Sequence, residues 1–321
     1  MYIEQAYKGF TESWRYIVGF LIVFICWQIL GGIPLLIALL LKSSSLSTMT
    51  TSDLGTMSET LGSNLFFLLI MLTFFAAMIS LWFVVKYIHK LSFVNFTTSR
   101  KRVDWKRVSF SFVLWGVISS AMIILDVYLS PENYEFSFKP VPFLVLLVLS
   151  IIFIPIQTSF EEFFTRGYLM QSIGLAVKNK WLPLIVSSSL FGLLHIFNPE
   201  VDKLGYGVLV YYIGTGFFLG ILTLMDEGLE LPLGFHASNN FFAALLVTAD
   251  WMAFNTNSIY KDVSEPVLGW DVLIPVFVIY PILLFIFSRK YGWKNWKDKL
   301  FGRVKTKEEF VALTDGRSDL A

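Results

Sequence analysis

Long apolar runs are the feature of this sequence that most constrains its fold. A helix needs roughly 20 mostly apolar residues to cross the hydrocarbon core of a membrane, and the chain offers about eight such runs. The runs cover residues 14–41, 64–85, 109–129, 141–156 continuing toward 177, 181–197, 207–225, 231–248 and 271–287. The sequence therefore predicts an all-α fold, a polytopic membrane bundle of about eight transmembrane helices.

The composition agrees with a surface that faces lipid. Of the 321 residues, 55% are hydrophobic and 15% are charged, whereas soluble globular domains carry about 25% charged residues. A net charge of +1 gives no electrostatic basis for binding nucleic acid. The single cysteine, Cys26, excludes an intrachain disulfide and a cysteine-rich metal site.

The distribution of Lys and Arg predicts which ends of the spans are cytoplasmic. Residues 86–107 contain seven Lys and Arg, and residues 289–321 contain nine. The loops that alternate with these hold one each: Lys42, Lys139, Lys203 and Lys261. The positive-inside rule then favours a cell-membrane protein with both termini cytoplasmic. We expect residues 1–288 to form the bundle and residues 289–321 to form a basic cytoplasmic tail.

Three ionisable residues follow the apolar run at 141–156. They are Glu161, Glu162 and Arg166, and an ionisable residue within a span costs at least about 2.5–3.5 kcal/mol on insertion scales. On a helix Glu162 and Arg166 are four residues apart and can pair along one face. Glu161 is displaced by about 100° and stays free to act as a general base. The alternative is an ion pair that only joins two helices, or part of a proton relay in a transporter.

Two of the three histidines also lie in apolar runs, whereas His89 lies in a basic loop where a solvated role is expected. His195 ends the stretch that begins at Phe191, and His236 precedes Asn240 by four residues, on the same helix face. Neutral imidazoles could orient a water molecule, and the Asn240 amide could donate to an oxyanion.

The same side chains could instead hold a divalent metal. Glu161, His195 and His236 supply the oxygen and nitrogen donors that suit zinc. Against a metal, His236 and Asn240 do not form the two-histidine helical spacing of zinc proteases. Both versions activate water, and neither needs a serine or cysteine nucleophile.

The depth of the two histidines in a simple up-and-down bundle is a difficulty. If the fifth span begins at the cytoplasmic residues 178–180, His195 lies about 21 Å deep, and His236 lies only about 8 Å from the same face. Either the span with His195 starts outside the hydrocarbon, or residues 204–226 are re-entrant, or the helices tilt into a cavity.

At these residues the sequence resembles the CPBP family, the CAAX prenyl endopeptidases of the Abi type and their bacterial relatives. Members share three intramembrane motifs: Glu-Glu-x-x-x-Arg, Phe-x-x-x-His and His-x-x-x-Asn. All three occur in family order, as Glu161-Glu162-x-x-x-Arg166, Phe191-x-x-x-His195 and His236-x-x-x-Asn240. The resemblance covers roughly residues 140–248, the expected protease core.

The resemblance implies an eight-helix bundle around an intramembrane cavity. It also implies that Glu161 activates the attacking water. By the resemblance, Glu162 and Arg166 support this carboxylate. His195 and His236 bind or polarise the water and the carbonyl, and Asn240 stabilises the oxyanion. Family names often say metalloprotease, although a metal-free glutamate mechanism is also argued.

The predicted function is therefore that of an intramembrane endopeptidase that hydrolyses a peptide or a membrane protein. The resemblance allows a lipidated substrate, because eukaryotic members of the family act on prenylated proteins. The glutamate mechanism needs no cofactor, and the metal version needs one divalent ion such as zinc. One alternative is a non-catalytic immunity or scaffold protein of the same fold. Another is an ion-coupled secondary transporter, although no second polar-interrupted segment mirrors residues 161–166 in the other half.

Overall fold

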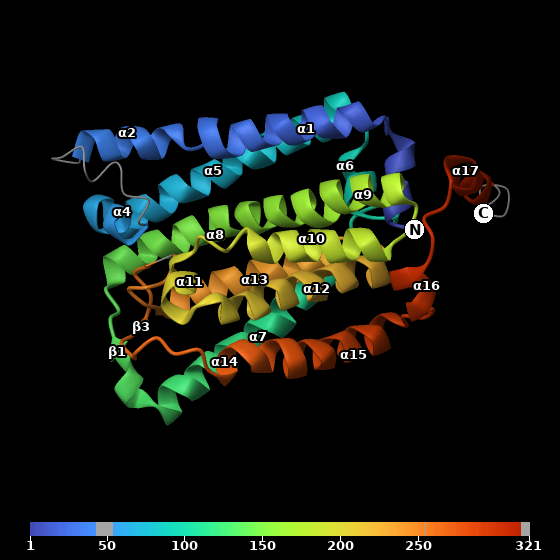
Figure 1. Cartoon of the computed structure of the whole chain (residues 1–321). Coiled ribbons are helices and arrows are strands. Elements are labelled where there is room, and N and C mark those ends of the chain that lie inside the picture. Colours follow the sequence, from blue (N-terminus) through green and yellow to red (C-terminus); the bar gives the residue numbers. More distant parts are fainter. Residues whose placement is uncertain (43–53, 254, 316–321) are drawn as a thin grey trace.

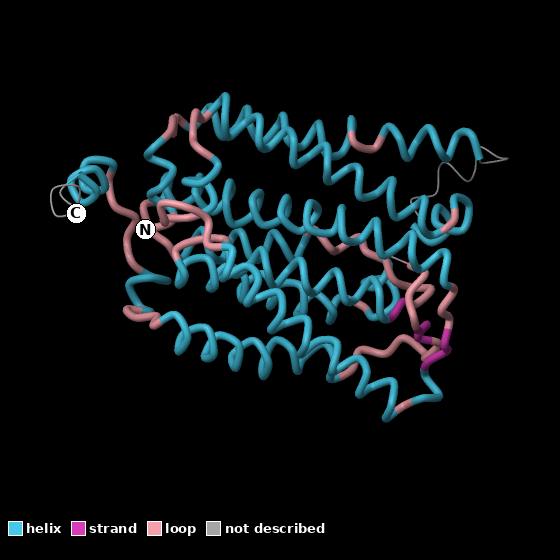
Figure 2. The backbone as a smooth tube through the Cα atoms, turned by 180° about the vertical axis from the view of Figure 1, so that it is seen from behind, coloured by secondary structure: helices cyan, strands magenta, loops and turns pink. Residues whose placement is uncertain are grey.

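The computed structural model describes residues 1–42, 54–253 and 255–315. Helices run side by side along one axis, and both termini lie at the same end of the bundle (Figure 1). The predicted all-α membrane bundle is confirmed. Within the described residues, β structure with named strands is limited to three short pieces at the opposite end (Figure 2).

Six helical segments are long and apolar enough to cross a membrane, counted over the described residues. Several contain a π-helical turn, where the chain shifts from i→i−4 to i→i−5 hydrogen bonds. The segments comprise α1 (Ser13–Ile25) with η2 (Cys26–Leu30) and α2 (Ile33–Lys42); α5 (Ser63–Phe83) with η3 (Val84–Ile88); α7 (Trp105–Leu129); α8 (Pro140–Glu162) with η5 (Phe163–Leu169) and α9 (Met170–Val177); η6 (Tyr206–Val208) with α12 (Leu209–Asp226); and α14 (Trp270–Ile274) with η7 (Pro275–Ile279) and α15 (Tyr280–Tyr291).

The two remaining predicted spans are shorter helices inside the bundle. They are α10 (Trp181–Leu193), which packs against α12, and α13 (Glu230–Leu246), which packs against α7 and α8. The predicted span at 181–197 is too long, because α10 ends at Leu193. Asn198 is extended, as expected of a residue that precedes a proline, so the helix cannot continue through Pro199.

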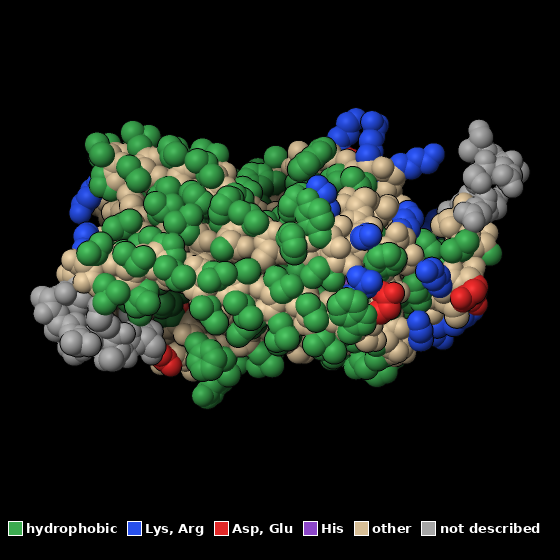
Figure 3. Space-filling view, turned by 90° about the horizontal axis from the view of Figure 1, so that it is seen from above, with side chains coloured by type: hydrophobic (Ala, Val, Ile, Leu, Met, Phe, Trp, Pro, Cys, Tyr) green, Lys and Arg blue, Asp and Glu red, His purple; other side chains and the backbone are tan. Residues whose placement is uncertain are grey.

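The surface of the bundle matches a chain that spans a membrane several times. Apolar side chains cover its length, and Lys and Arg gather toward the end that carries both termini (Figure 3). Among the described segments, six long helices and two shorter ones give an even number of passes, which agrees with termini at one end. The chain is a multi-pass membrane protein, and the cytoplasmic placement of its termini stays a prediction.

Short elements close both ends of the bundle. In the three-stranded sheet, β3 pairs antiparallel with β1 and parallel with β2, with Glu135 opposite Lys261. The short elements at the sheet end are α4 (Leu54–Leu61), η4 (Pro131–Asn133), β1 (Tyr134–Phe136), α11 (Pro199–Leu204), β2 (Val247–Thr248) and β3 (Tyr260–Asp262). Those at the terminal end are η1 (Ile3–Lys8), α6 (Phe93–Thr97), α16 (Trp296–Phe301) and α17 (Lys307–Asp315).

The described part of the predicted tail packs against the N-terminal segment. Ile3 of η1 and Phe310 of α17 are buried in one apolar cluster with Val304. Residues 316–321 of the predicted tail lie outside the described residues. The two ends of the chain therefore share one small core at the terminal end of the bundle.

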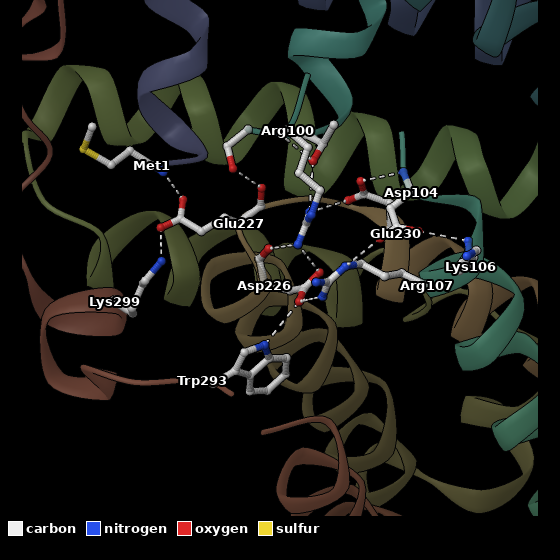
Figure 4. Close-up of polar contacts among 12 residues, drawn as sticks. Met1, Arg100, Asp104, Lys106, Arg107, Asp226, Glu227, Glu230, Trp293 and Lys299 are labelled. Carbon is white, nitrogen blue, oxygen red and sulfur yellow. Dashed lines mark hydrogen bonds and ion pairs between the residues drawn. The ribbon is translucent and has the colours of Figure 1, made fainter. Parts of the chain in front are cut away.

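An ionic network sets the depth at which α13 begins (Figure 4). Arg100 donates to Asp226 Oδ2 at 2.9 Å and to Glu230 Oε2 at 3.1 Å, and the Glu230 side chain is fully buried. The backbone N–H of Leu229 donates to the Thr97 carbonyl at 2.9 Å. The segment from Thr97 to Asp104 therefore contacts the start of α13, because the Asp104 N–H also donates to Glu230 Oε1 at 3.2 Å.

Candidate active site

The first motif lies where α8 passes into a π-helical turn. The helix is α-helical to Glu162, and η5 follows at once; π-turns within helices are frequent at functional sites. Arg166 Nη1 donates to Glu162 Oε1 at 2.9 Å, and both side chains are fully buried. The predicted pairing of these two residues is therefore present, and it neutralises a carboxylate that would otherwise be costly inside the bundle.

Arg166 is also fixed by groups outside its own motif. Its Nη2 donates to the Gly216 carbonyl of α12 at 3.1 Å, and its guanidinium carbon lies 4.2 Å from the centroid of the Phe191 ring. A guanidinium over an aromatic face is attracted by the ring quadrupole. The aromatic residue of the second motif thus contacts the cation of the first.

His236 lies between the two carboxylates of the first motif. Its Nδ1 is 2.8 Å from Glu162 Oε1, and its Nε2 is 3.5 Å from Glu161 Oε2. An ionised carboxylate only accepts hydrogen bonds, so Nδ1 of His236 donates to Glu162 and Nε2 faces Glu161. The structure therefore joins motifs that are more than seventy residues apart.

Glu161 is the carboxylate with an accessible side. Its side chain is 16% exposed, whereas that of Glu162 is 0% exposed. Gln157 Nε2 donates to Glu161 Oε1 at 2.6 Å, and the 3.5 Å from Oε2 to His236 is longer than an ordinary hydrogen bond. Of the two adjacent glutamates, Glu161 is thus the one that a water molecule can approach.

His195 lies in the turn after α10, one turn beyond Phe191. Its Nδ1 is 2.8 Å from the Phe191 carbonyl, which can only accept, so Nδ1 carries the proton and Nε2 has a free lone pair. Its ring stacks on Tyr212 with centroids 4.2 Å apart. The Phe191 ring contacts both imidazoles, with centroids 5.1 Å from His195 and 5.7 Å from His236.

Asn240 reaches Glu161 through a residue that the sequence analysis missed. Asn240 Nδ2 donates to Gln157 Oε1 at 3.0 Å, and Gln157 in turn donates to Glu161. Gln157 is 4% exposed. It lies four residues before Glu161, so a polar side chain one turn before the motif on the same face is the signal that could have found it.

The residues predicted to hold a metal ion are not gathered into one cluster. Within the described residues, no group of three or more His, Cys, Asp or Glu is placed to hold one. The three predicted ligands, Glu161, His195 and His236, form no such group. Nδ1 of each imidazole is hydrogen-bonded, which leaves Nε2 as the other ring nitrogen. A carboxylate and two imidazoles can orient and deprotonate a water molecule.

Comparisons with known proteins match the region that carries these contacts. The sequence model described as type II CAAX prenyl endopeptidase Rce1-like matches residues 140–242, from the start of α8 into α13. The chain is 31% identical over 260 residues to the uncharacterized protein YyaK of Bacillus subtilis (strain 168). The aligned region covers 80% of this chain and 84% of that protein. No solved structure matches.

Proposed function

The chain belongs to the Rce1-like family of type II CAAX prenyl endopeptidases, and we propose that it is an intramembrane endopeptidase in which Glu161 activates water. One observation carries the proposal: His236 lies between two adjacent glutamates, of which one is neutralised by Arg166 and the other is accessible. The pairing with Arg166 and the difference in exposure give the two carboxylates different environments, and therefore different roles.

In the first step Glu161 acts as a general base. Its carboxylate takes a proton from a water molecule while the water oxygen bonds to the carbonyl carbon of the scissile peptide bond. The carbonyl electron pair moves onto oxygen and gives a tetrahedral oxyanion. The free lone pair on Nε2 of His195 supports this step, because it can accept a hydrogen bond from the attacking water.

In the second step the oxyanion collapses and the bond between carbon and nitrogen breaks. The proton held by Glu161 passes to the leaving nitrogen, so the products are a carboxylic acid and an amine, and the enzyme returns to its first state. Asn240 has a second amide N–H besides the one that it gives to Gln157, and this N–H can stabilise the oxyanion.

Glu162 and Arg166 act through His236. The Arg166 guanidinium pairs with Glu162, and the Glu162 carboxylate accepts a hydrogen bond from Nδ1 of His236. A hydrogen bond at one ring nitrogen decides what the other nitrogen presents. Nε2 of His236 is thereby directed toward Glu161 and toward the substrate.

The position of the site supports a proposal for the substrate class. The reacting groups lie inside a membrane bundle, so we propose a peptide bond in a membrane-embedded or lipid-anchored chain, with the bilayer as the medium that delivers it. No nucleic acid is proposed as a partner.

The experiment compares the wild-type protein with Glu161→Gln, which keeps the size of the side chain. Purified protein in liposomes is given a fluorogenic peptide that ends in a Cys-aliphatic-aliphatic-X sequence, with and without a farnesyl group. In parallel, membrane peptides from cells expressing each form are compared by mass spectrometry. We expect Glu161→Gln to lower kcat by about 10²–10⁴, the usual contribution of a general base, with unchanged insertion and thermal stability.

Two outcomes would overturn the proposal. One is cleavage at the wild-type rate by Glu161→Gln. The other is a wild-type protein that cleaves no peptide in either assay and whose cellular role survives Glu161→Gln, which would support a non-catalytic scaffold of the same fold.

A further inference from the structure

A chain of hydrogen-bonded side chains runs from α7 through α13 to α8 and ends on Glu161. We call it the amide chain. It consists of four hydrogen bonds: Trp115 Nε1 to Asn239 Oδ1 at 3.1 Å, Asn239 Nδ2 to Asn240 Oδ1 at 3.1 Å, Asn240 Nδ2 to Gln157 Oε1 at 3.0 Å, and Gln157 Nε2 to Glu161 Oε1 at 2.6 Å. The three helices are thus joined at the candidate site.

The two ends of the amide chain fix its direction. The indole N–H of Trp115 can only donate, and an ionised Glu161 can only accept. Each of the three amides between them therefore has one orientation, with its oxygen toward Trp115 and its nitrogen toward Glu161. Turning any single amide would set two donors or two acceptors against each other.

Burial makes a wrong orientation costly. Trp115 and Gln157 are each 4% exposed, so water cannot readily replace a lost partner. Trp115 is itself held by aromatic packing, with its ring centroid 4.6 Å from that of Phe235. The donor end of the amide chain is thus a rigid anchor.

From these contacts we infer that Trp115, Asn239 and Gln157 are positioning residues that keep an N–H donor on Oε1 of Glu161. The inference rests on the proposed role of Glu161. With Oε1 occupied, Oε2 is the oxygen that faces His236 and takes the proton from water. Asn240, the last residue of the third motif, is then a link in this chain as well as a donor to the oxyanion.

The first test reverses the chain without changing its size. In Asn239→Asp the new carboxylate still accepts from Trp115 but cannot donate to Asn240. Asn240 and Gln157 then have to turn, and the Gln157 oxygen meets Glu161. Loss of a hydrogen bond to a charged group predicts a kcat lower by about 10- to 100-fold, with KM unchanged. Trp115→Phe removes the anchor without reversing the chain, so its loss is smaller.

The second test is a pH profile of Gln157→Glu. At neutral pH this side chain faces Glu161 as a second carboxylate, and activity falls. As the pH is lowered, a protonated carboxyl can again accept from Asn240 and donate to Glu161. We expect the ratio of variant to wild-type activity to rise as the pH falls. His236, Glu162 and Arg166 face Glu161 in both proteins, so the ratio removes their common effect.

The matched control is Ser238→Ala. Ser238 Oγ donates to the Phe112 carbonyl at 2.7 Å, a partly buried hydrogen bond between the same helices α13 and α7 but outside the amide chain. This variant should lower thermal stability and leave kcat and the pH profile unchanged. Wild-type kcat in Asn239→Asp, or a constant activity ratio in Gln157→Glu, would overturn the inference while leaving the proposed function intact.

A spectroscopic measurement covers the case in which the wild-type protein cleaves nothing and the proposed function fails. The carboxyl band of Glu161 is assigned by infrared difference spectroscopy from its loss in Glu161→Gln. We expect this band to shift in Asn239→Asp and not in Ser238→Ala. An identical band in Asn239→Asp would show that the amide chain does not reach Glu161.

Discussion

At the scale of single residues, the site is built from charged side chains whose burial without a partner would cost free energy. Glu162 and Arg166 are fully buried, and each neutralises the other. His236 uses the same carboxylate oxygen, so three groups from two helices depend on one pair of charges. This dependence explains why the pair occurs within a membrane bundle despite its cost.

The Glu162–Arg166 pair gives a prediction about stability. Arg166→Met leaves Glu162 as an unpaired buried charge, and we expect the free energy of unfolding to fall by about 3–5 kcal/mol. Adding Glu162→Gln removes that charge and should restore part of the loss. Thermal unfolding of both variants in the same detergent measures the effect. A double variant less stable than Arg166→Met alone would contradict it.

At the scale of elements, caps and turns decide where helices begin and end. At the start of α17, Thr306 N–H donates to Glu309 Oε2 at 2.9 Å and Glu309 N–H donates to Thr306 Oγ1 at 3.3 Å, a reciprocal capping box. Arg303 donates to both oxygens of the Glu309 carboxylate. The chain is thereby turned so that Phe310 reaches the core shared with η1.

The cap of α17 predicts a response to acid. Hydrogen bonds from Arg303 lower the pKa of Glu309 from 4.5 to about 2. Because the folded pKa is the lower one, the cap stabilises α17 fully above pH 4.5, and this contribution is lost as the pH falls toward 2. Amide hydrogen exchange across residues 307–314, corrected for intrinsic rates, should accelerate only below about pH 4.5. Glu309→Gln should exchange fast at neutral pH, and equal protection in both proteins would contradict the prediction.

At the scale of the whole molecule, the terminal end is held together by charges from four parts of the chain (Figure 4). Arg100 bridges Asp226 and Glu230, Arg107 pairs with Asp226, and Glu227 pairs with Lys299 and with the amino group of Met1. These contacts join α12 and α13 to both ends of the chain. They hold the start of α13, the helix that carries His236.

The network predicts that Arg100 contributes to the stability of the bundle. Arg100→Met leaves Glu230 buried without its cation. We expect a loss of about 3 kcal/mol in the free energy of unfolding, the lower end of the range for buried pairs, because Arg100 is 25% exposed. Lys101→Met, at an exposed neighbouring position, is the control. Equal thermal unfolding of the two variants in detergent would contradict the prediction.

The features that depend on neighbours along the chain could be predicted from the sequence. Apolar length indicated the membrane helices, and a spacing of four residues indicated the pairing of Glu162 with Arg166. The three motifs also indicated the family. Each of these follows from helical periodicity or from the cost of exposing polar backbone to lipid.

Contacts between side chains that are far apart in the sequence depend on how the helices pack. The contact of Gln157 with Asn240 spans 83 residues, and that of His236 with Glu162 spans 74. Both depend on how far α13 is inserted and how it is rotated against α7 and α8, which is set by packing and by the buried contacts of Glu230. A linear sequence fixes the order of side chains on a helix face, but the depth and rotation of that face are properties of the assembled bundle.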